Sequence, residues 1–226
     1  MRLNGMHRFI KEFTPRLNDD ERSVALAIYR SLVDSGRASL AGLSEETRLS
    51  RSRVDEMVSS WPGVYRDQGR DIVGFWGLTA QPMSKHVLQI NGTRRYAWCA
   101  WDCLFLPSIL GQTVQAASVC PQTGAPIALT ISPTAAQEVQ PGSTVLSMLI
   151  PEVASCRQDV VSSFCHFVHF FRDRKAAKEW TSTRPGTHVI SLQMGMELGH
   201  MKNEWQFGQR IPPADRSRVA GSRSYP

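Results

Sequence analysis

The sequence contains no uninterrupted apolar run of about 18 residues, which is the length that a membrane-spanning helix requires. The N-terminal residues Met1–Gly5 also lack the apolar segment of a secretory signal peptide. The five cysteines are odd in number and form neither a Cys-x-x-Cys pair nor a small disulfide framework. We therefore expect a cytoplasmic protein that does not bind membranes and keeps free thiols available for a soft metal.

A strong excess of basic charge is also absent from most of the chain, although the formal net charge is +6. Residues 1–80 hold 12 basic and 11 acidic side chains, and residues 81–208 hold 10 and 8. Residues 209–226 carry four basic side chains and one acidic one in a segment rich in Arg, Ser and Pro, which predicts a disordered basic tail. With 42% hydrophobic and 20% charged residues, the composition of the 226-residue chain is otherwise that of a globular protein.

Helical patterns dominate the N-terminal part of the chain. Acidic residues followed by an apolar stripe predict a helix from Asp19 to Ser35, which Gly36 ends. Two shorter helices and then two short strands around a glycine turn are expected at 40–49, 50–61 and 64–73. Three helices and a hairpin predict a winged-helix-like N-terminal domain over residues 1–80.

A winged helix raises the hypothesis of DNA binding. Arg48, Arg51 and Arg53 could face phosphates from the start of the third helix. Acidic residues surround them, however, and a nearly neutral region gains little from the release of counterions. We expect no nucleic-acid partner, although a winged-helix regulator that senses metal through the cysteines stays open as an alternative.

Strand patterns dominate residues 81–208. The expected strands are 85–90, 113–119, 127–132, 143–150, 164–171 and 188–194. The expected helices are 95–105, 152–159, 176–182 and 197–207. We therefore predict an α+β fold in which the winged-helix-like domain precedes a mainly antiparallel sheet domain with flanking helices.

Two thiols and a carboxylate share one face of the helix expected at 95–105. Cys99, Asp102 and Cys103 stand at i, i+3 and i+4 of this helix. Trp98 and Trp101 flank them, so the carboxylate lies in an otherwise apolar setting. Desolvation raises the pKa of a buried carboxyl group, and an unpaired buried charge is costly. Asp102 must therefore be neutral, paired or chemically active, and we take it as a candidate catalytic residue.

A distant thiol, Cys165, stands in the expected strand 164–171, where period-two alternation places it on the same side as His169. A structural zinc site is one alternative, with the ligands Cys99, Cys103, Cys165 and His169. That site leaves Asp102 without a role. We expect His169 to be a hydrogen-bonded histidine of the sheet rather than a metal ligand.

Several separated runs of the chain resemble the alkylmercury lyase family. They are Gly77–Thr79, Tyr96–Asp102, Ser118–Pro126, Thr130–Pro133 and Phe164–Phe171, and they occur in the family's order. The resemblance implies that Cys99, Asp102 and Cys165 belong to the active site. Cys103 departs from the family pattern and is a further candidate metal ligand. The resemblance also implies that the N-terminal domain serves packing rather than DNA recognition.

The resemblance implies an organomercurial substrate whose carbon–mercury bond is cleaved by protonation. Soft thiolates are the preferred ligands of a soft metal, so Cys99 and Cys165 would hold the mercury. Coordination deprotonates a thiol, and Asp102 can collect that proton and pass it to the leaving carbon. The expected products are a hydrocarbon and Hg(II).

The expected partners follow from the need to release Hg(II) after the reaction. Two thiolates do not give up Hg(II) to water, so small external thiols are needed. The resemblance implies a mercuric reductase as the eventual acceptor and detoxification of mercury as the role. We expect no cofactor, because Hg(II) is bound only as the product.

Overall fold

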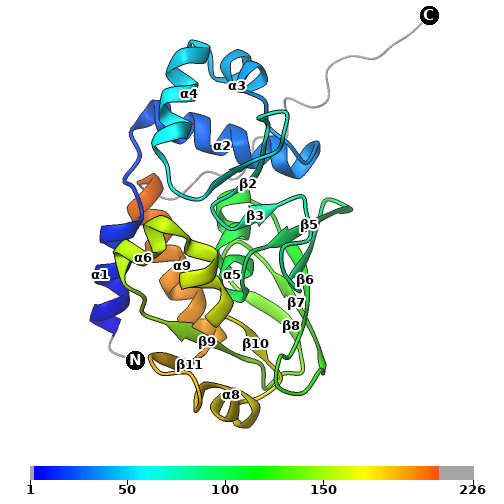
Figure 1. Ribbon diagram of the computed structural model, residues 1–226. Helices are drawn as coiled ribbons and strands as arrows, with labels where there is room; N and C mark the ends of the chain where they lie inside the picture. Colours follow the sequence, from blue (N-terminus) through cyan, green and yellow to red (C-terminus); the bar gives the residue numbers. More distant parts are fainter. Residues whose placement is uncertain (1–2, 209–226) are drawn as a thin grey trace, which may run out of the picture.

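The computed structural model describes residues 3–208 and shows a mixed α/β fold with a large antiparallel sheet (Figure 1). The helices between residues 19 and 60 gather at one end of the molecule, away from most of the sheet. The basic tail predicted at 209–226 lies outside the described residues. Between residues 3 and 208, no helix is both long enough and apolar enough to cross a membrane.

Local sequence signals explain the N-terminal helices. These are α1 (Leu3–Phe13), α2 (Asp19–Asp34), α3 (Leu40–Thr47) and α4 (Arg51–Ser60). Asn18 caps α2 by accepting the N–H of Glu21, whose carboxylate accepts the N–H of Asn18 in return. The hydroxyl groups of Ser39 and Ser50 cap the next two helices. The helices expected at 19–35, 40–49 and 50–61 are confirmed as α2, α3 and α4, whereas α1 was not expected.

An eight-stranded antiparallel sheet forms the centre of the fold. Its strands are β1 (Val64–Arg66), β2 (Ile72–Phe75), β3 (Leu78–Thr79), β4 (Val87–Ile90), β5 (Thr93–Ala97), β6 (Val114–Val119), β7 (Pro126–Ile131) and β8 (Ala136–Gln140). They lie in the order β1-β2-β3-β5-β4-β6-β7-β8. The expected hairpin at 64–73 forms the edge of this sheet, because β2 pairs with β3 and β3 pairs with β5. The sheet therefore continues across residue 80 without a break.

The helix expected to carry Cys99 and Cys103 begins later than the sequence pattern predicts. Strand β5 follows the turn at Asn91 and pairs with β4, and helix α5 (Ala100–Leu110) starts only after Cys99. The guanidinium group of Arg95 reaches back to α2 and donates to the carbonyl of Val33 at 2.7 Å. The prediction of a helix at 95–105 is therefore wrong for its first residues, because residues 95–97 pair in the sheet. Gly111 ends α5 in a left-handed conformation, as expected.

A second sheet and a chain of short turns replace the strand expected at 164–171. The sheet has the order β10-β9-β11, with β9 (Val145–Leu149), β10 (Phe170–Phe171) and β11 (Thr187–Ser191). Helix α7 (Val160–Ser163) and the 3₁₀ turn η1 (Cys165–Phe167) precede β10. Only the last two residues of the expected strand pair in the sheet. The expectation is wrong for Cys165, because local bonds such as that from the N–H of Val168 to the carbonyl of Cys165 form a turn there.

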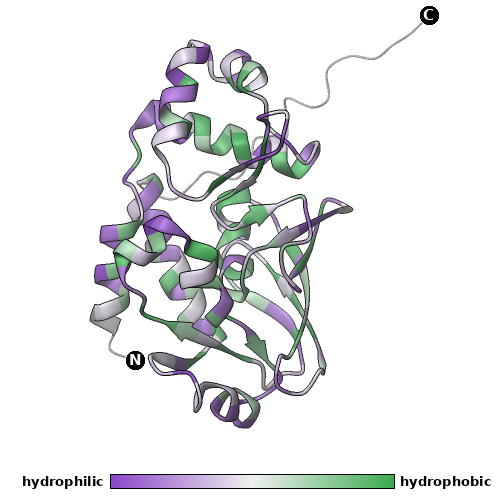
Figure 2. Ribbon diagram, in the orientation of Figure 1, coloured by the Kyte–Doolittle hydropathy of each residue, from purple (hydrophilic) through white to green (hydrophobic). Residues whose placement is uncertain are grey.

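Two long helices form the interior of the larger part of the molecule. The remaining helices are α6 (Val153–Gln158), α8 (Arg174–Thr181) and α9 (Leu192–Phe207). Helix α5 is hydrophobic along nearly its whole length, as Figure 2 shows, and it packs against α9. A Cβ atom added to Gly199 of α9 would lie 2.7 Å from the Cβ of Phe105. The absence of a side chain at Gly199 therefore lets the two helices approach closely.

Candidate active site

The start of helix α5 holds Cys99 and Asp102 together. Cys99 is the last residue before the helix and has an extended backbone, and Asp102 lies in the first turn. The backbone N–H of Cys99 donates to Oδ2 of Asp102 at 2.7 Å. A carboxylate is favoured at this position because it accepts a free N–H at the positive end of the helix dipole. The fold therefore fixes the carboxylate next to the first thiol.

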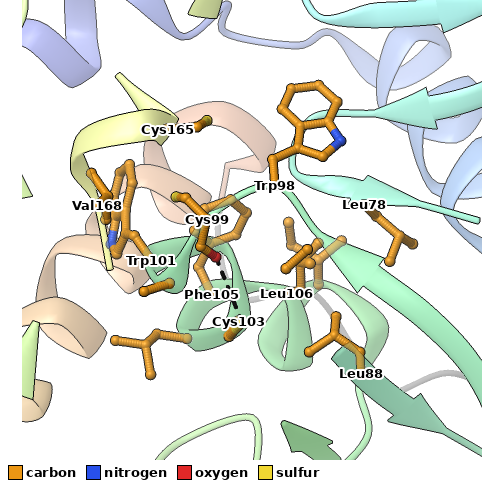
Figure 3. Close-up of a cluster of buried hydrophobic side chains, with 14 of the residues drawn as sticks. Leu78, Leu88, Trp98, Cys99, Trp101, Cys103, Phe105, Leu106, Cys165 and Val168 are labelled. Atoms are coloured by element: carbon orange, nitrogen blue, oxygen red, sulfur yellow. Dashed lines mark hydrogen bonds between the residues drawn. The ribbon is translucent and has the colours of Figure 1, made fainter. Parts of the chain in front are cut away.

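Cys165 arrives at the same point from a distant part of the chain. It opens the turn η1, and the carbonyl of Val168 at the end of this turn accepts the N–H of Ala100 at 3.1 Å. The sulfurs of Cys99 and Cys165 and a carboxylate oxygen of Asp102 all lie within 4.8 Å of one another. Figure 3 shows Cys165 on the segment that faces the start of α5, with Trp98 and Trp101 on either side of Cys99. All three functional groups are buried.

The other metal-ligand candidates lie outside this cluster. Cys103 points its sulfur back toward the carbonyl of Cys99, at 3.6 Å, as the dashed line in Figure 3 marks. His169 makes a 2.8 Å hydrogen bond through Nε2 with the carbonyl of His166. Between residues 3 and 208, the only group of three or more candidate ligands is Cys99, Asp102 and Cys165. The four-ligand zinc site considered from the sequence is therefore not assembled.

Burial sets the protonation of Asp102. Desolvation raises the pKa of this carboxyl group from 3.8 to about 7. Hydrogen bonds from Cys99 and the positive charge of Lys202 oppose the increase. An aspartate with an ordinary pKa would be fully ionised at neutral pH, whereas this one can both take up and give away a proton near pH 7.

The two thiols of the cluster are also held in their protonated forms. Burial raises the pKa of Cys99 well above its usual value, and its hydrogen bond with Cys165 and the nearby charge of Asp102 add to the increase. That hydrogen bond lowers the pKa of Cys165, but burial and the charge of Asp102 outweigh it and leave the pKa raised. A bound metal cation reverses this situation, because coordination favours the thiolate.

An apolar cavity of about 70 Å³ opens beside the cluster, and Asp102 and Cys165 both line it. Aromatic side chains make up much of its wall, namely Phe9, Phe13, Trp76, Trp98, Trp101, Phe105 and Phe164. A cavity of this kind suits an organic group attached to a metal that the two sulfurs hold.

Lys202 is a site residue that the sequence analysis missed. It lies on α9, is only 6% exposed and lines the same cavity as Asp102. Its ammonium group lies 4.2 Å from the ring centroid of Phe105, and burial lowers its pKa to about 7 while the charge of Asp102 opposes this. Lys202 is polar, as is Gln206 four residues later, so the hydrophobic periodicity of α9 gave no signal of its burial.

Gly77 shapes the other side of the carboxylate. Its φ is +96°, and a Cβ atom there would lie 2.6 Å from Oδ1 of Asp102. Its carbonyl accepts the N–H of Trp98 at 3.0 Å, which ties this turn to the residue before Cys99. Gly77 therefore provides the space that the carboxylate occupies.

The fold and the site together define a class of protein in which two buried thiols and a carboxyl group form a cluster with the ligand types that suit a soft metal. The family model described as alkylmercury lyase matches residues 78–203. The alkylmercury lyase of Pseudomonas putida is 35% identical over 176 residues, which cover 78% of this chain and 81% of that protein. The alkylmercury lyase of Staphylococcus epidermidis is 33% identical over 199 residues, covering 84% of this chain and 89% of that protein.

A solved structure described as the mercury-bound form of MerB2 has the same fold. It is similar with a TM-score of 0.73 and 21% sequence identity, over 89% of this chain and 98% of that chain. The family model and the two relatives carry the assignment. This chain belongs to the alkylmercury lyase family.

Proposed function

We propose that Cys99, Asp102 and Cys165 carry out the reaction of this carbon–mercury lyase, the protonolysis of alkyl and aryl mercurials. The observation that supports this assignment is the meeting of the two sulfurs and the carboxylate oxygen within 4.8 Å in a buried cluster. Two thiolates are the ligand set that a soft metal prefers. Asp102 lies close enough to both sulfurs to take up a thiol proton and pass it to the carbon that is bound to mercury.

The reaction balances with these three groups alone. One cysteine displaces the original ligand of mercury, and its thiol proton leaves with that ligand. The second cysteine then binds mercury as a thiolate, and Asp102 takes up its proton. The carbon–mercury bond breaks with both electrons on carbon, and the proton of Asp102 forms the new C–H bond. Hydrocarbon leaves, Hg(II) stays on Cys99 and Cys165, and Asp102 is ionised again.

Single substitutions separate the proposed roles. Cys99→Ala and Cys165→Ala should each abolish the formation of benzene from phenylmercury. One sulfur cannot supply the metal with enough electron density for the carbon–mercury bond to break. Asp102→Asn should still bind the mercurial but release no benzene. Headspace gas chromatography measures the hydrocarbon, and native mass spectrometry measures bound mercury. Cys120→Ala, which removes another buried cysteine, is the matched control. Full turnover in Cys99→Ala or Cys165→Ala would contradict the pairing.

The expectations for partners and location remain part of the proposal. Small thiols remove Hg(II) from the two thiolates, and a mercuric reductase receives it, in a cytoplasmic pathway of mercury detoxification. No resident cofactor takes part, since the metal is substrate and product. Neither the family nor its named relatives support the alternative of a metal-responsive regulator.

The proposal keeps the division of the chain made from the sequence. Residues 1–80 act as a winged-helix-like packing module, residues 81–208 as the catalytic domain and residues 209–226 as a basic tail. Supporting the first part, α3 packs against both α2 and α4, and α2 also contacts β2. Limited proteolysis near residue 80 would test the division. Because β3 pairs with β5 across this point, cleavage should give two discrete fragments that stay associated until denaturant is added. Degradation to small peptides would contradict the division.

A further inference from the structure

Cys165 lines two cavities formed by residues 3–208, and Asp102 lines only the first of these two. The first cavity is the apolar one that Asp102 and Lys202 line. The second cavity, of about 250 Å³, is lined by Cys165 together with Lys85, His86 and His169 among others. The two cavities share only Trp98 and Cys165. A molecule in the second cavity can therefore approach the sulfur of Cys165 without passing the carboxyl group of Asp102.

The second cavity differs from the first in its polarity. Lys85 is its only lysine, arginine or carboxylate among the residues that the structure describes. Burial, with a contribution from His169, lowers the pKa of His86 to about 3, and burial also lowers the pKa of His169. These two imidazoles are therefore neutral near pH 7, and Lys85 supplies a fixed positive charge. Lys85 is itself exposed to solvent.

Two apolar side chains at the rim of the second cavity are unusually exposed to solvent. Met83 and Val119 are 40% and 36% exposed, and they are the only large hydrophobic side chains that are exposed in the described part of the chain. Both line this cavity. A binding site with an apolar rim and a few placed polar groups is typical for a small molecule that has carbon atoms and one charged end.

We propose that the second cavity binds a small thiol that carries a carboxylate, and that this thiol removes Hg(II) from Cys165. The proposal rests on the function proposed above, which leaves Hg(II) on Cys99 and Cys165. Lys85 attracts the carboxylate of the thiol, and Met83 and Val119 contact its carbon chain.

The exchange of ligands needs no oxidant or reductant. The sulfur of the incoming thiol forms a bond to Hg(II), and the bond from Hg(II) to the sulfur of Cys165 breaks. The proton of the incoming thiol is transferred to the sulfur of Cys165, which becomes a thiol again once the metal has left. A second thiol then repeats the exchange at Cys99. The organic group and the thiol thus approach through different cavities.

The release step can be followed on its own by loading the protein with one equivalent of HgCl₂. Mercaptoacetate, which is anionic, and 2-mercaptoethanol, which is neutral, are then mixed with the loaded protein, and native mass spectrometry follows the loss of mercury. The measured quantity is the release rate with mercaptoacetate divided by the release rate with 2-mercaptoethanol. This ratio, compared between protein variants, cancels the different intrinsic reactivity of the two thiols.

In Lys85→Glu the ratio should fall about tenfold, because one partly screened charge near the carboxylate is reversed. Lys175→Glu makes the same change of net charge at an exposed position of α8 that does not line the cavity, and its ratio should equal that of the unmodified protein. An unchanged ratio in Lys85→Glu, or an equal fall in both variants, would overturn the proposal. Benzene formation by the unmodified protein, measured separately, reports on the proposed lyase function.

Discussion

Asp102 should lower the stability of the free protein at neutral pH, and its replacement by Asn should restore it. Burial raises the pKa of this carboxyl group from 3.8 to about 7 in the folded protein. A carboxyl group with a raised pKa favours folding while it is protonated, below its unfolded pKa. That advantage is lost as the pH rises through the folded pKa. The loss therefore falls between about pH 4 and pH 7.

The size of the effect follows from the same two pKa values. Each pH unit between 3.8 and about 7 changes the free energy of unfolding by about 1.4 kcal/mol, so the total is on the order of 4 kcal/mol. Asn has the same shape as Asp, does not ionise, and its side-chain oxygen can still accept the N–H of Cys99. Asp102→Asn should therefore gain about 4 kcal/mol relative to the unmodified protein between about pH 4 and pH 8.

Urea unfolding of metal-free protein under reducing conditions, at about pH 4.5 and about pH 8, measures most of this difference. Asp159→Asn is the control of opposite sign. Asp159 is exposed, and its hydrogen bonds with Ser162 lower its pKa, so its contribution is present above the unfolded pKa and is lost as the pH falls. That variant should lose stability at the higher pH. A difference for Asp102→Asn that does not change with pH would refute the reasoning.

Three further substitutions test the surroundings of the cluster. Cys103→Ala should keep hydrocarbon release within about threefold of the unmodified rate, because this sulfur lies outside the cluster, and headspace analysis measures it. Gly77→Ala should lower release about 100-fold, because the added Cβ would lie 2.6 Å from Oδ1 of Asp102 and displace the carboxylate. Lys202→Met removes a positive charge that lowers the pKa of Asp102. If Asp102 must be ionised to take up the thiol proton, the acid limb of the pH profile of kcat/KM should move to higher pH in Lys202→Met.

Elements that depend on local signals could be predicted from the sequence. Asn18, Ser39 and Ser50 each cap a helix through a bond to the first turn, so the positions of α2, α3 and α4 follow from neighbouring residues alone. The hairpin of β6 and β7 follows equally from alternation around a turn. In such elements, the information needed lies within a few residues.

The segment of Cys165 could not be predicted in this way. Its run of aromatic residues is typical of a strand, yet the chain forms a 3₁₀ turn at Cys165–Phe167. The geometry is set by distant partners, since the hydroxyl group of Ser147 donates to the carbonyl of Phe167 and accepts the N–H of His169. The pairing of Cys165 with Cys99 followed from the resemblance to the family. Lys202 could not be found as a neighbour of Asp102, because their proximity comes from the packing of α9 on α5.

Burial of the cluster raises the pKa values of the two thiols and of the carboxyl group alike. The pKa values of Cys99, Cys165 and Asp102 are all raised, so the free site holds neutral or nearly neutral groups and avoids the cost of adjacent buried anions. A mercury cation is then what makes the thiols release their protons, because coordination favours the thiolate. In the proposed reaction, the second of these protons appears next to a carboxyl group whose pKa is about 7, and this group holds it until the carbon accepts it. In the proposed reaction, the substrate itself therefore supplies the charge that makes the thiols release their protons.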